Sequence, residues 1–171
     1  KKSTYKIEVA TPNYEIDLNR DGVPESIKVE KRDGADYFVV QDALGRTKSE
    51  LKLNAKGVNS VLYKAQLKTL NSNTDALILY FDEGHSGIAV FQSTARIYMA
   101  TIDQRDLEKI SFNKGPAFYY EKEWPVDQYS RRYYNVSVFD FNKDGTKEVA
   151  VSYNNIQRIY FYLGKGRWQA L

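Results

Sequence analysis

The stretch D-L-N-R-D-G-V-P-E at residues 17–25 returns as D-F-N-K-D-G-T-K-E at residues 140–148. Both copies read D-x-N-x-D-G-x-x-E, so oxygen-bearing side chains recur at every second position and a glycine follows the third of them. A calcium ion binds six to eight oxygens at about 2.3–2.6 Å, and a tight loop can direct alternate side chains and a main-chain carbonyl at one point. The sequence therefore predicts two calcium loops.

Each copy offers four side chains and one main-chain carbonyl as ligands. The expected ligands are Asp17, Asn19, Asp21, the Val23 carbonyl and Glu25 in the first copy, and Asp140, Asn142, Asp144, the Thr146 carbonyl and Glu148 in the second. Gly22 and Gly145 stand where each loop must turn sharply, which a residue without a Cβ does at low steric cost. Crowded carboxylates repel one another, so an ion that binds them stabilises the folded chain. We expect both loops to hold Ca²⁺ as a structural cofactor.

Two other interpretations of the loops exist. An EF-hand opens with the same letters, but it requires a bidentate glutamate at loop position twelve and a helix on each side. Position twelve is Lys28 in one copy and Val151 in the other, and the flanking residues alternate as strands do. The second alternative is a pair of hairpin turns whose Asp and Asn side chains bond their own backbone. The shared register of the two copies favours metal loops.

A strand, a D-x-N-x-D-G-x-x-E loop and an apolar strand resemble the FG-GAP and VCBS-type repeats of calcium-binding β-propellers, which include the integrin α-subunit head. In that family the loop joins the first two strands of a four-stranded blade, so the resemblance implies blades fastened by metal. The FG and GAP signatures themselves are absent. A shorter copy without glycine lies at residues 70–80, where Asp75 takes the place of Glu148, and we assign it no metal.

The rest of the sequence predicts an all-β chain. Alternating apolar and polar runs are bounded by turn residues, and the 14 tyrosines among 171 residues suit half-exposed strands. We expect a single all-β domain over residues 1–171, built of antiparallel, four-stranded, propeller-like blades in an open or incomplete array. The expected repeat units are residues 5–53, 58–112 and 133–171. The run at residues 76–81 is nearly all apolar and predicts a strand covered on both faces.

An aromatic-rich insertion is expected at residues 113–132, between the second and third units. Connections vary while strands hold a scaffold, and aromatic and arginine side chains dominate binding hot spots, so this stretch is the predicted partner-binding face. The side chains assigned to it are Tyr119, Tyr120, Trp124, Tyr129 and Arg131. The alternative is that these rings cover a sheet edge or fill a gap between blades. The expected partner is a protein or a glycan.

The sequence favours a binding or adhesion module without catalytic activity. His85, the single histidine, lies in G-H-S-G, which lacks the second glycine and the helix of a nucleophile elbow, so residues 82–87 are interpreted as a polar hairpin tip. One histidine without cysteine excludes the common catalytic zinc sets. Two alternatives stay open. One is a hydrolase of polysaccharide or peptidoglycan that uses carboxylates such as Glu123 and Asp127. The other is an inhibitor or accessory subunit whose tip at residues 82–87 enters a partner's cleft.

Composition limits the possible partners and locations. The net charge of +3 is spread along the chain, unlike the concentrated basic patches of nucleic-acid binders. No run of about eighteen apolar residues predicts a membrane span. Calcium is abundant outside the cytoplasm, so we expect a periplasmic or secreted protein. The sequence shows no signal peptide, which fits a chain that starts after a cleavage site or at another boundary.

Overall fold

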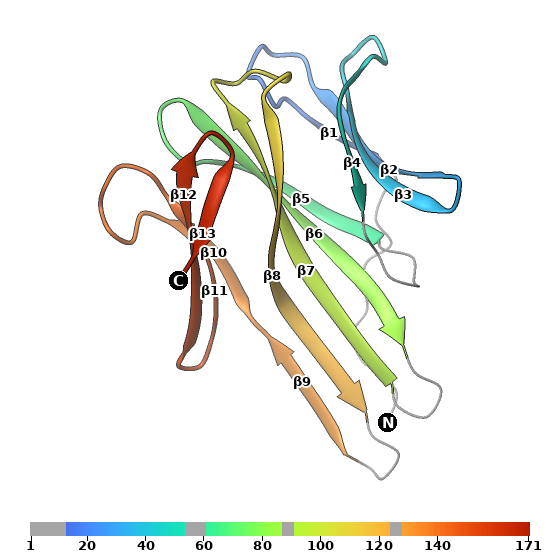
Figure 1. The fold of residues 1–171 in the computed structure, drawn as a ribbon, viewed down its shortest axis with the longest axis vertical. Coiled ribbons are helices and arrows are strands. Elements are labelled where there is room, and N and C mark those ends of the chain that lie inside the picture. The colour runs from blue at the N-terminus through green and yellow to red at the C-terminus, as the bar shows by residue number, and fades with distance from the viewer. Residues whose placement is uncertain (1–12, 54–60, 87–90, 124–127) are drawn as a thin grey trace.

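The computed structural model describes residues 13–53, 61–86, 91–123 and 128–171, and all the regular elements in these ranges are β-strands (Figure 1). They form three antiparallel sheets in which strands adjacent in sequence are adjacent in space. The prediction of an all-β chain is therefore confirmed for these residues. The strand that was expected to open the first unit at residue 5 lies outside the described residues.

The first and third sheets each have four strands. The first contains β1 (Asn13–Ile16), β2 (Glu25–Arg32), β3 (Ala35–Gln41) and β4 (Thr47–Leu53). The third contains β10 (Asn135–Phe139), β11 (Glu148–Tyr153), β12 (Ile156–Gly164) and β13 (Arg167–Ala170). In both sheets the repeated nine-residue loop connects the first strand to the second. Strands, not helices, flank both loops, so the EF-hand is excluded.

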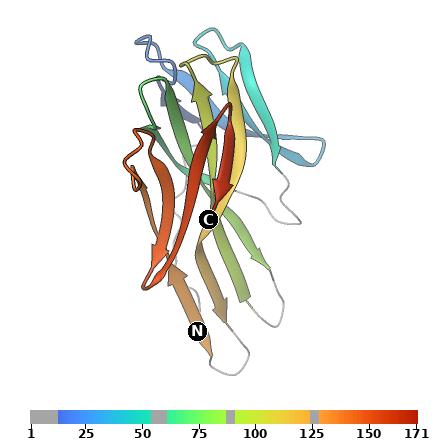
Figure 2. The ribbon, with the colours of Figure 1, turned by 60° about the vertical axis from the view of Figure 1, so that its left-hand side comes forward.

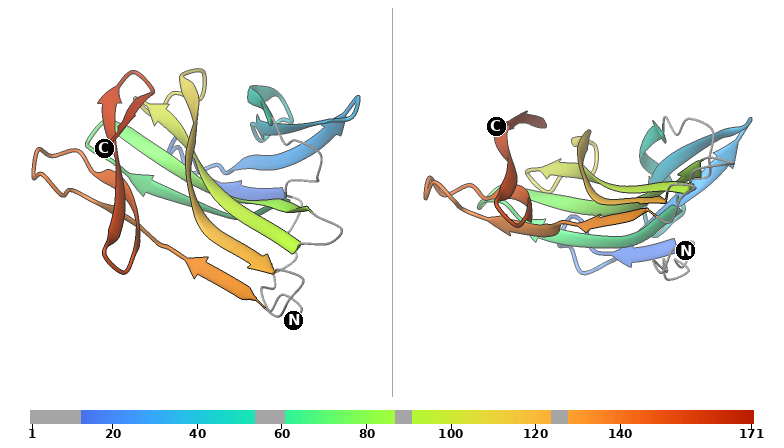
Figure 3. Two further views of the ribbon diagram at one scale, coloured as in Figure 1. Left: turned by 60° about the horizontal axis from the view of Figure 1, so that its bottom comes forward. Right: turned by 90° about the horizontal axis from the view of Figure 1, so that it is seen from below.

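The middle sheet has five strands. They are β5 (Val61–Thr69), β6 (Thr74–Ser86), β7 (Phe91–Asp103), β8 (Ile110–Glu123) and β9 (Tyr129–Tyr133). This sheet lies between the other two in Figures 1 and 3, and in Figure 2 the third sheet lies in front of it. Its long strands are the largest surface on which the two smaller sheets can pack.

The expected insertion at residues 113–132 is not an insertion in the described part of the chain. Residues 113–123 continue β8, and residues 129–132 belong to β9, which pairs with β8 in the register Tyr119↔Tyr133. The strand pattern was hidden because the five residues from Gly115 to Tyr119 are all buried, and because the pairing of β8 with β7 is shifted by bulges. A strand buried on both faces does not alternate.

The turn predicted at residues 82–87 is wrong for residues 82–86, which continue β6. Asp82 pairs with Ala95 and His85 pairs with Ser93, with a bulge between the two pairs. A bulge admits an extra residue into a strand, so the polar run that suggests a turn here lies within the ladder. Gly87 lies outside the described residues.

Two hydrophobic cores hold the three sheets together. One joins the first sheet to the middle sheet and includes Phe38, Leu77 and Phe81, and the other joins the middle sheet to the third and includes Ile78 and Val149. Successive residues of β6 therefore contribute to opposite cores, as the two faces of a strand do. This confirms the prediction that residues 76–81 are covered on both faces.

Candidate metal centres

The first loop, residues 17–25, joins β1 to β2 and holds its carboxylates with its own backbone. Asp17 accepts hydrogen bonds from the N–H groups of Asp21 and Gly22, at 3.1 and 2.8 Å. Asp21 accepts one from the N–H of Val23 at 2.8 Å. Gly22 has a φ angle of +88°, a conformation that is costly for a residue with a Cβ. The loop is thus a tight turn that presents two carboxylates on its inner side.

The second loop, residues 140–148, joins β10 to β11 and repeats this geometry. Asp140 accepts hydrogen bonds from the N–H groups of Asp144 and Gly145 at 3.1 and 2.9 Å, and Asp144 accepts one from Thr146 at 2.8 Å. Gly145 has a φ angle of +91°. The repeated letters therefore specify one loop conformation, although the residues between them differ.

A buried glutamate closes each loop. Glu25 and Glu148 are each 2% exposed. The Oε2 atom of Glu25 accepts a hydrogen bond from the Leu18 N–H, and that of Glu148 accepts one from the Phe141 N–H, both at 2.6 Å. Each glutamate thereby connects the last residue of its loop to the second.

The electrostatic environment of Glu25 opposes its ionisation. Burial raises the pKa of Glu25, the hydrogen bond from the Leu18 N–H lowers it, and the charges of Asp21 and Asp17 raise it again, with a net rise. Each of these three carboxylates is therefore held close to like charges. A divalent cation bound among them would reverse the sign of this interaction.

The spacing of the carboxylates fits calcium. One carboxylate oxygen from each of Asp17, Asp21 and Glu25 lies within 4.8 Å of the others, and the oxygens of Asp140, Asp144 and Glu148 meet the same criterion. Two ligands that each lie about 2.4 Å from an ion are at most about 4.8 Å apart. Hard oxygen donors are also the set that calcium prefers. The residues of both loops thus fit a calcium ion.

The asparagine of each loop makes a hydrogen bond that a plain hairpin turn without metal would also contain. The Oδ1 atoms of Asn19 and Asn142 accept hydrogen bonds from Asp21 and Asp144, each at 3.2 Å. Such side-chain bonds to the backbone two residues on are typical of plain hairpin turns. A plain turn, however, requires no buried glutamate facing two aspartates. The carboxylate triads, not the asparagines, are what favours metal binding.

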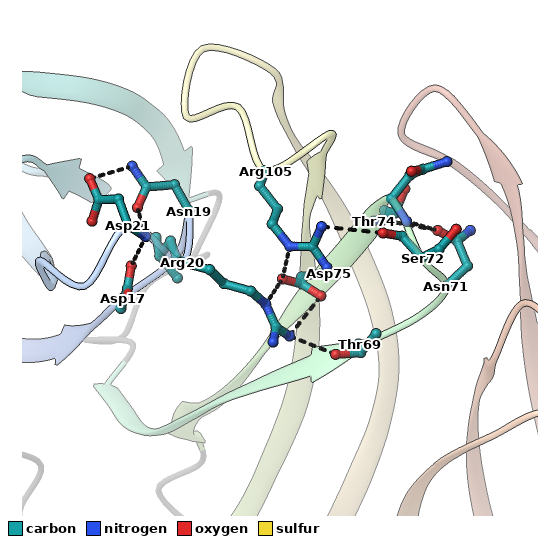
Figure 4. Close-up of polar contacts among 12 residues, drawn as sticks. Asp17, Asn19, Arg20, Asp21, Thr69, Asn71, Ser72, Thr74, Asp75 and Arg105 are labelled. Atoms are coloured by element: carbon teal, nitrogen blue, oxygen red, sulfur yellow. Dashed lines mark hydrogen bonds and ion pairs between the residues drawn. The ribbon is translucent and has the colours of Figure 1, made fainter.

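A third carboxylate occupies the corresponding place in the middle sheet. Asp75 is fully buried near the start of β6, after the short turn at residues 70–73 (Figure 4). Arg20, from the first loop, donates to both of its oxygens at 2.8 and 3.1 Å. Arg105, from the β7–β8 connection, forms an ion pair with Asp75 at 3.7 Å and donates to the Ser72 carbonyl at 3.2 Å. Two guanidinium groups therefore surround the carboxylate that corresponds to the loop glutamates.

The middle turn also contacts the second loop. The Lys147 N–H donates to the Leu70 carbonyl at 2.9 Å, and the Asn71 amide donates to the Thr146 hydroxyl at 3.3 Å. Together with the bonds from Arg20 to Asp75, these contacts place both candidate metal loops against opposite sides of one turn. The contacts of Arg20 and Arg105 with Asp75 could not be predicted from the sequence, since nothing in the chain order brings either arginine near this carboxylate.

The residues assigned to a partner-binding face do not form one surface. Tyr119 is fully buried in the core between the middle and third sheets, so it belongs to the packing and not to a contact face. Tyr120 and Tyr129 are partly buried, Arg131 is exposed, and Trp124 lies outside the described residues. The hydroxyls of Tyr119 and Tyr129 both donate to the Oε2 atom of Glu121, at 2.7 and 2.6 Å. Tyr119 therefore fits the alternative interpretation, in which the rings of this segment fill a gap between sheets.

The residues that the alternative functions invoke are only partly described. His85 lies in β6, paired with Ser93, and its side chain lies outside the description, as does Asp127. Glu123 is partly buried at the end of β8.

No helix among the described residues is long and apolar enough to cross a membrane. Comparison of the chain with protein-family models, curated proteins and solved structures finds no significant match.

Proposed function

We propose that the protein is a calcium-stabilised binding or adhesion module that works outside the cytoplasm, and that its two metal sites are structural and not catalytic. The observation that carries this proposal is the repetition of one loop geometry, with a buried glutamate and two aspartates whose oxygens meet within 4.8 Å. In each site three carboxylates face one another. Two ions would neutralise most of that charge and fasten the first two strands of each outer sheet.

The resemblance to FG-GAP and VCBS-type repeats extends this proposal to the architecture. In that family the calcium loop joins the first and second strands of a four-stranded antiparallel blade, and both outer sheets have this topology. The middle sheet carries its degenerate loop at the same connection. We therefore interpret the three sheets as propeller-like blades in an open array. Membership in the family is part of the proposal.

The composition of the two loops also supports the proposed location outside the cytoplasm. The loops lack the bidentate glutamate at position twelve that strengthens EF-hands, so they suit the high calcium concentrations found outside cells or in the periplasm. A ligand of the module would be a protein or a glycan. Among the residues proposed to contact it, Tyr120, Tyr129 and Arg131 keep accessible surface.

Thermal unfolding with 1 mM CaCl₂ and with excess EDTA tests the structural role. An ion present at about 100 times its Kd stabilises a folded protein by roughly 2.7 kcal/mol per site, so the unfolding midpoint should fall by several degrees in EDTA. The double variant D21N/D144N is the matched control, and its midpoint should not respond to EDTA. An identical midpoint for the wild-type protein in both buffers would refute the proposed role of calcium.

A further inference from the structure

A pocket of about 380 Å³ lies where the middle sheet meets the third, and none of its lining residues belongs to the two loops. Its lining residues are Gln92, Ser93 and Thr94 from β7, Tyr120, Glu121 and Lys122 from β8, Ser130 and Arg132 from β9, and Tyr134 and Arg158 from the third-sheet side. Pockets that bind small molecules usually have volumes of about 300–1,000 Å³. This one is large enough for a single sugar residue or a similar group.

The strand register shows that six of these lining residues share one face of the middle sheet. Thr94, Tyr120 and Arg132 are directly opposite one another on β7, β8 and β9. Two residues along, Gln92, Lys122 and Ser130 are opposite one another in the same way. Residues paired across antiparallel strands, and residues two apart on one strand, project from the same face of a sheet. Six polar side chains therefore form two parallel rows on one face.

Glu121 also lines the pocket, but it is only 1% exposed. The hydroxyls of Tyr119 and Tyr129 donate to its Oε2 atom at 2.7 and 2.6 Å. The other charged side chains that line the pocket are basic.

Three cations surround this pocket. Lys122 and Arg132 project from the sheet, and Arg158 approaches from β12. The Tyr120 hydroxyl raises the pKa of Arg158, and both side chains line the pocket. Among the described residues, no carboxylate oxygen lies within 4.0 Å of the guanidinium groups of Arg132 and Arg158, whereas Arg20, Arg32, Arg46 and Arg96 all have such a partner.

We propose that this pocket binds an acidic saccharide, that is, a sugar bearing a carboxylate or a sulfate. The guanidinium of an arginine presents parallel N–H donors that match the two oxygens of such a group, so Arg132 and Arg158 bind the anion. The amide of Gln92 and the hydroxyls of Thr94 and Ser130 provide both donors and acceptors for the neighbouring sugar hydroxyls. The inference names a ligand class for the proposed binding module and rests on that proposal.

The uncharged polar groups favour a saccharide over the other anions. A phosphopeptide offers few hydroxyls to the second row of Gln92, Lys122 and Ser130. Nucleic acid requires basic residues spread along a backbone path, whereas here the cations converge on one small pocket. Tyr120 adds a ring surface beside the anion, held edge-on against Tyr134 with centroids 6.0 Å apart.

Isothermal titration of the calcium-saturated protein tests this inference. The probes are glucuronic acid, a sulfated heparin-derived disaccharide, glucose and sodium sulfate, with a phosphoserine peptide as the competing class. We expect at least one acidic sugar to bind, glucose to bind far more weakly, and sulfate alone to bind more weakly than the sulfated sugar. Binding of glucuronic acid would indicate that the natural ligand is a free sugar acid. Binding of the disaccharide alone would indicate that the ligand is part of a polysaccharide.

The variants R132Q and R158Q should each weaken the binding of the acidic sugar roughly tenfold or more, since each removes a charged hydrogen-bonding partner. R167Q, which makes the same charge change at an exposed position on β13, should have no effect. Equal binding of sulfate and sugar, binding of the phosphopeptide alone, or no binding of any probe would overturn the inference.

The calcium-dependent unfolding midpoint keeps the two proposals separate. It should be the same in R132Q and R158Q as in the wild-type protein. If calcium stabilises the protein and no sugar binds, the saccharide inference fails and the calcium proposal stands. If sugar binds with the expected arginine dependence and EDTA leaves the midpoint unchanged, the calcium proposal fails instead.

Discussion

The two outer loops and the middle turn place a buried carboxylate at the same point of a sheet but neutralise it differently. Glu25 and Glu148 begin the second strands of the outer sheets, and Asp75 lies at the start of the second strand of the middle sheet. Each glutamate is accompanied by two aspartates, a set of carboxylates that could hold a metal ion. Asp75 instead receives the guanidinium groups of Arg20 and Arg105.

If the outer loops hold calcium as proposed, this position requires a positive charge that either an ion or an arginine can supply. A buried carboxylate is costly unless a cation or several hydrogen-bond donors compensate it. In the middle sheet the compensating positive charge comes from two arginine side chains of the protein itself. In the outer sheets, according to the proposed function, it comes from an ion in solution, so chelation should affect the outer sheets and leave the middle turn intact.

The substitution D75N should have the largest effect. It removes the buried charge that holds Arg20 and Arg105, and losing charged hydrogen bonds of this kind costs about 3 kcal/mol. Urea unfolding should show this loss equally in calcium and in EDTA, because no metal takes part. D33N is the matched control at an exposed turn and should change stability little. A loss that disappears in EDTA would mean that Asp75 binds metal.

The substitutions D21N and D144N should have the next largest effects, and only in calcium. Asparagine keeps the side-chain oxygen that accepts the hydrogen bond from Val23 or Thr146, so the turn is preserved while one negative ligand is lost. Each variant should lose about 2 kcal/mol of unfolding free energy in CaCl₂ and almost nothing in EDTA. Equal losses in both buffers would identify the aspartates as parts of a plain hairpin turn.

Alkaline pH tests the middle sheet without touching the loops. Burial raises the pKa of Tyr80 from 10.0 to about 12. The folded protein therefore keeps a proton that the unfolded chain releases, and stability present below pH 10 is lost as the pH rises towards 12. The free energy of unfolding should fall by roughly 1–2 kcal/mol over this range, and less in Y80F. A fall of the same size in Y80F would show that Tyr80 does not contribute.

The smallest effect on the unfolding midpoint is expected from substitutions at position four of the two loops. Arg20 and Lys143 both occupy loop position four with positive φ angles, but only Arg20 reaches the middle turn, whereas Lys143 is exposed. R20M should lower the unfolding midpoint in calcium and in EDTA, by less than D75N does, because Arg105 still faces Asp75. K143M should leave it unchanged. Equal responses of the two variants would contradict the role assigned to Arg20.

Local chemistry explains what could be predicted from the sequence. The loops are short, and each letter of D-x-N-x-D-G-x-x-E acts on a neighbour a few residues away, so the pattern alone indicated the conformation of residues 17–25. The strand at residues 76–81 was likewise evident because its apolar run is uninterrupted. In both cases the information lies within one segment.

The missed features all depend on contacts between distant segments. β8 was interpreted as an insertion because residues 115–119 are all buried and leave no alternation to detect. The pairing of Arg20 with Asp75 joins two loops that only the packing of the sheets brings together. The rows of Thr94, Tyr120 and Arg132 depend on strand register, which bulges shift and which the sequence does not display.

The most direct test is the calcium stoichiometry measured by isothermal titration of metal-free protein. The wild-type chain should bind two calcium ions, D21N and D144N should each retain one site of unchanged affinity, and D75N that remains folded should still bind two. Heat that indicates no calcium binding to the folded wild-type protein, or a third site that D75N abolishes, would contradict the account of two metal loops and one arginine-filled turn.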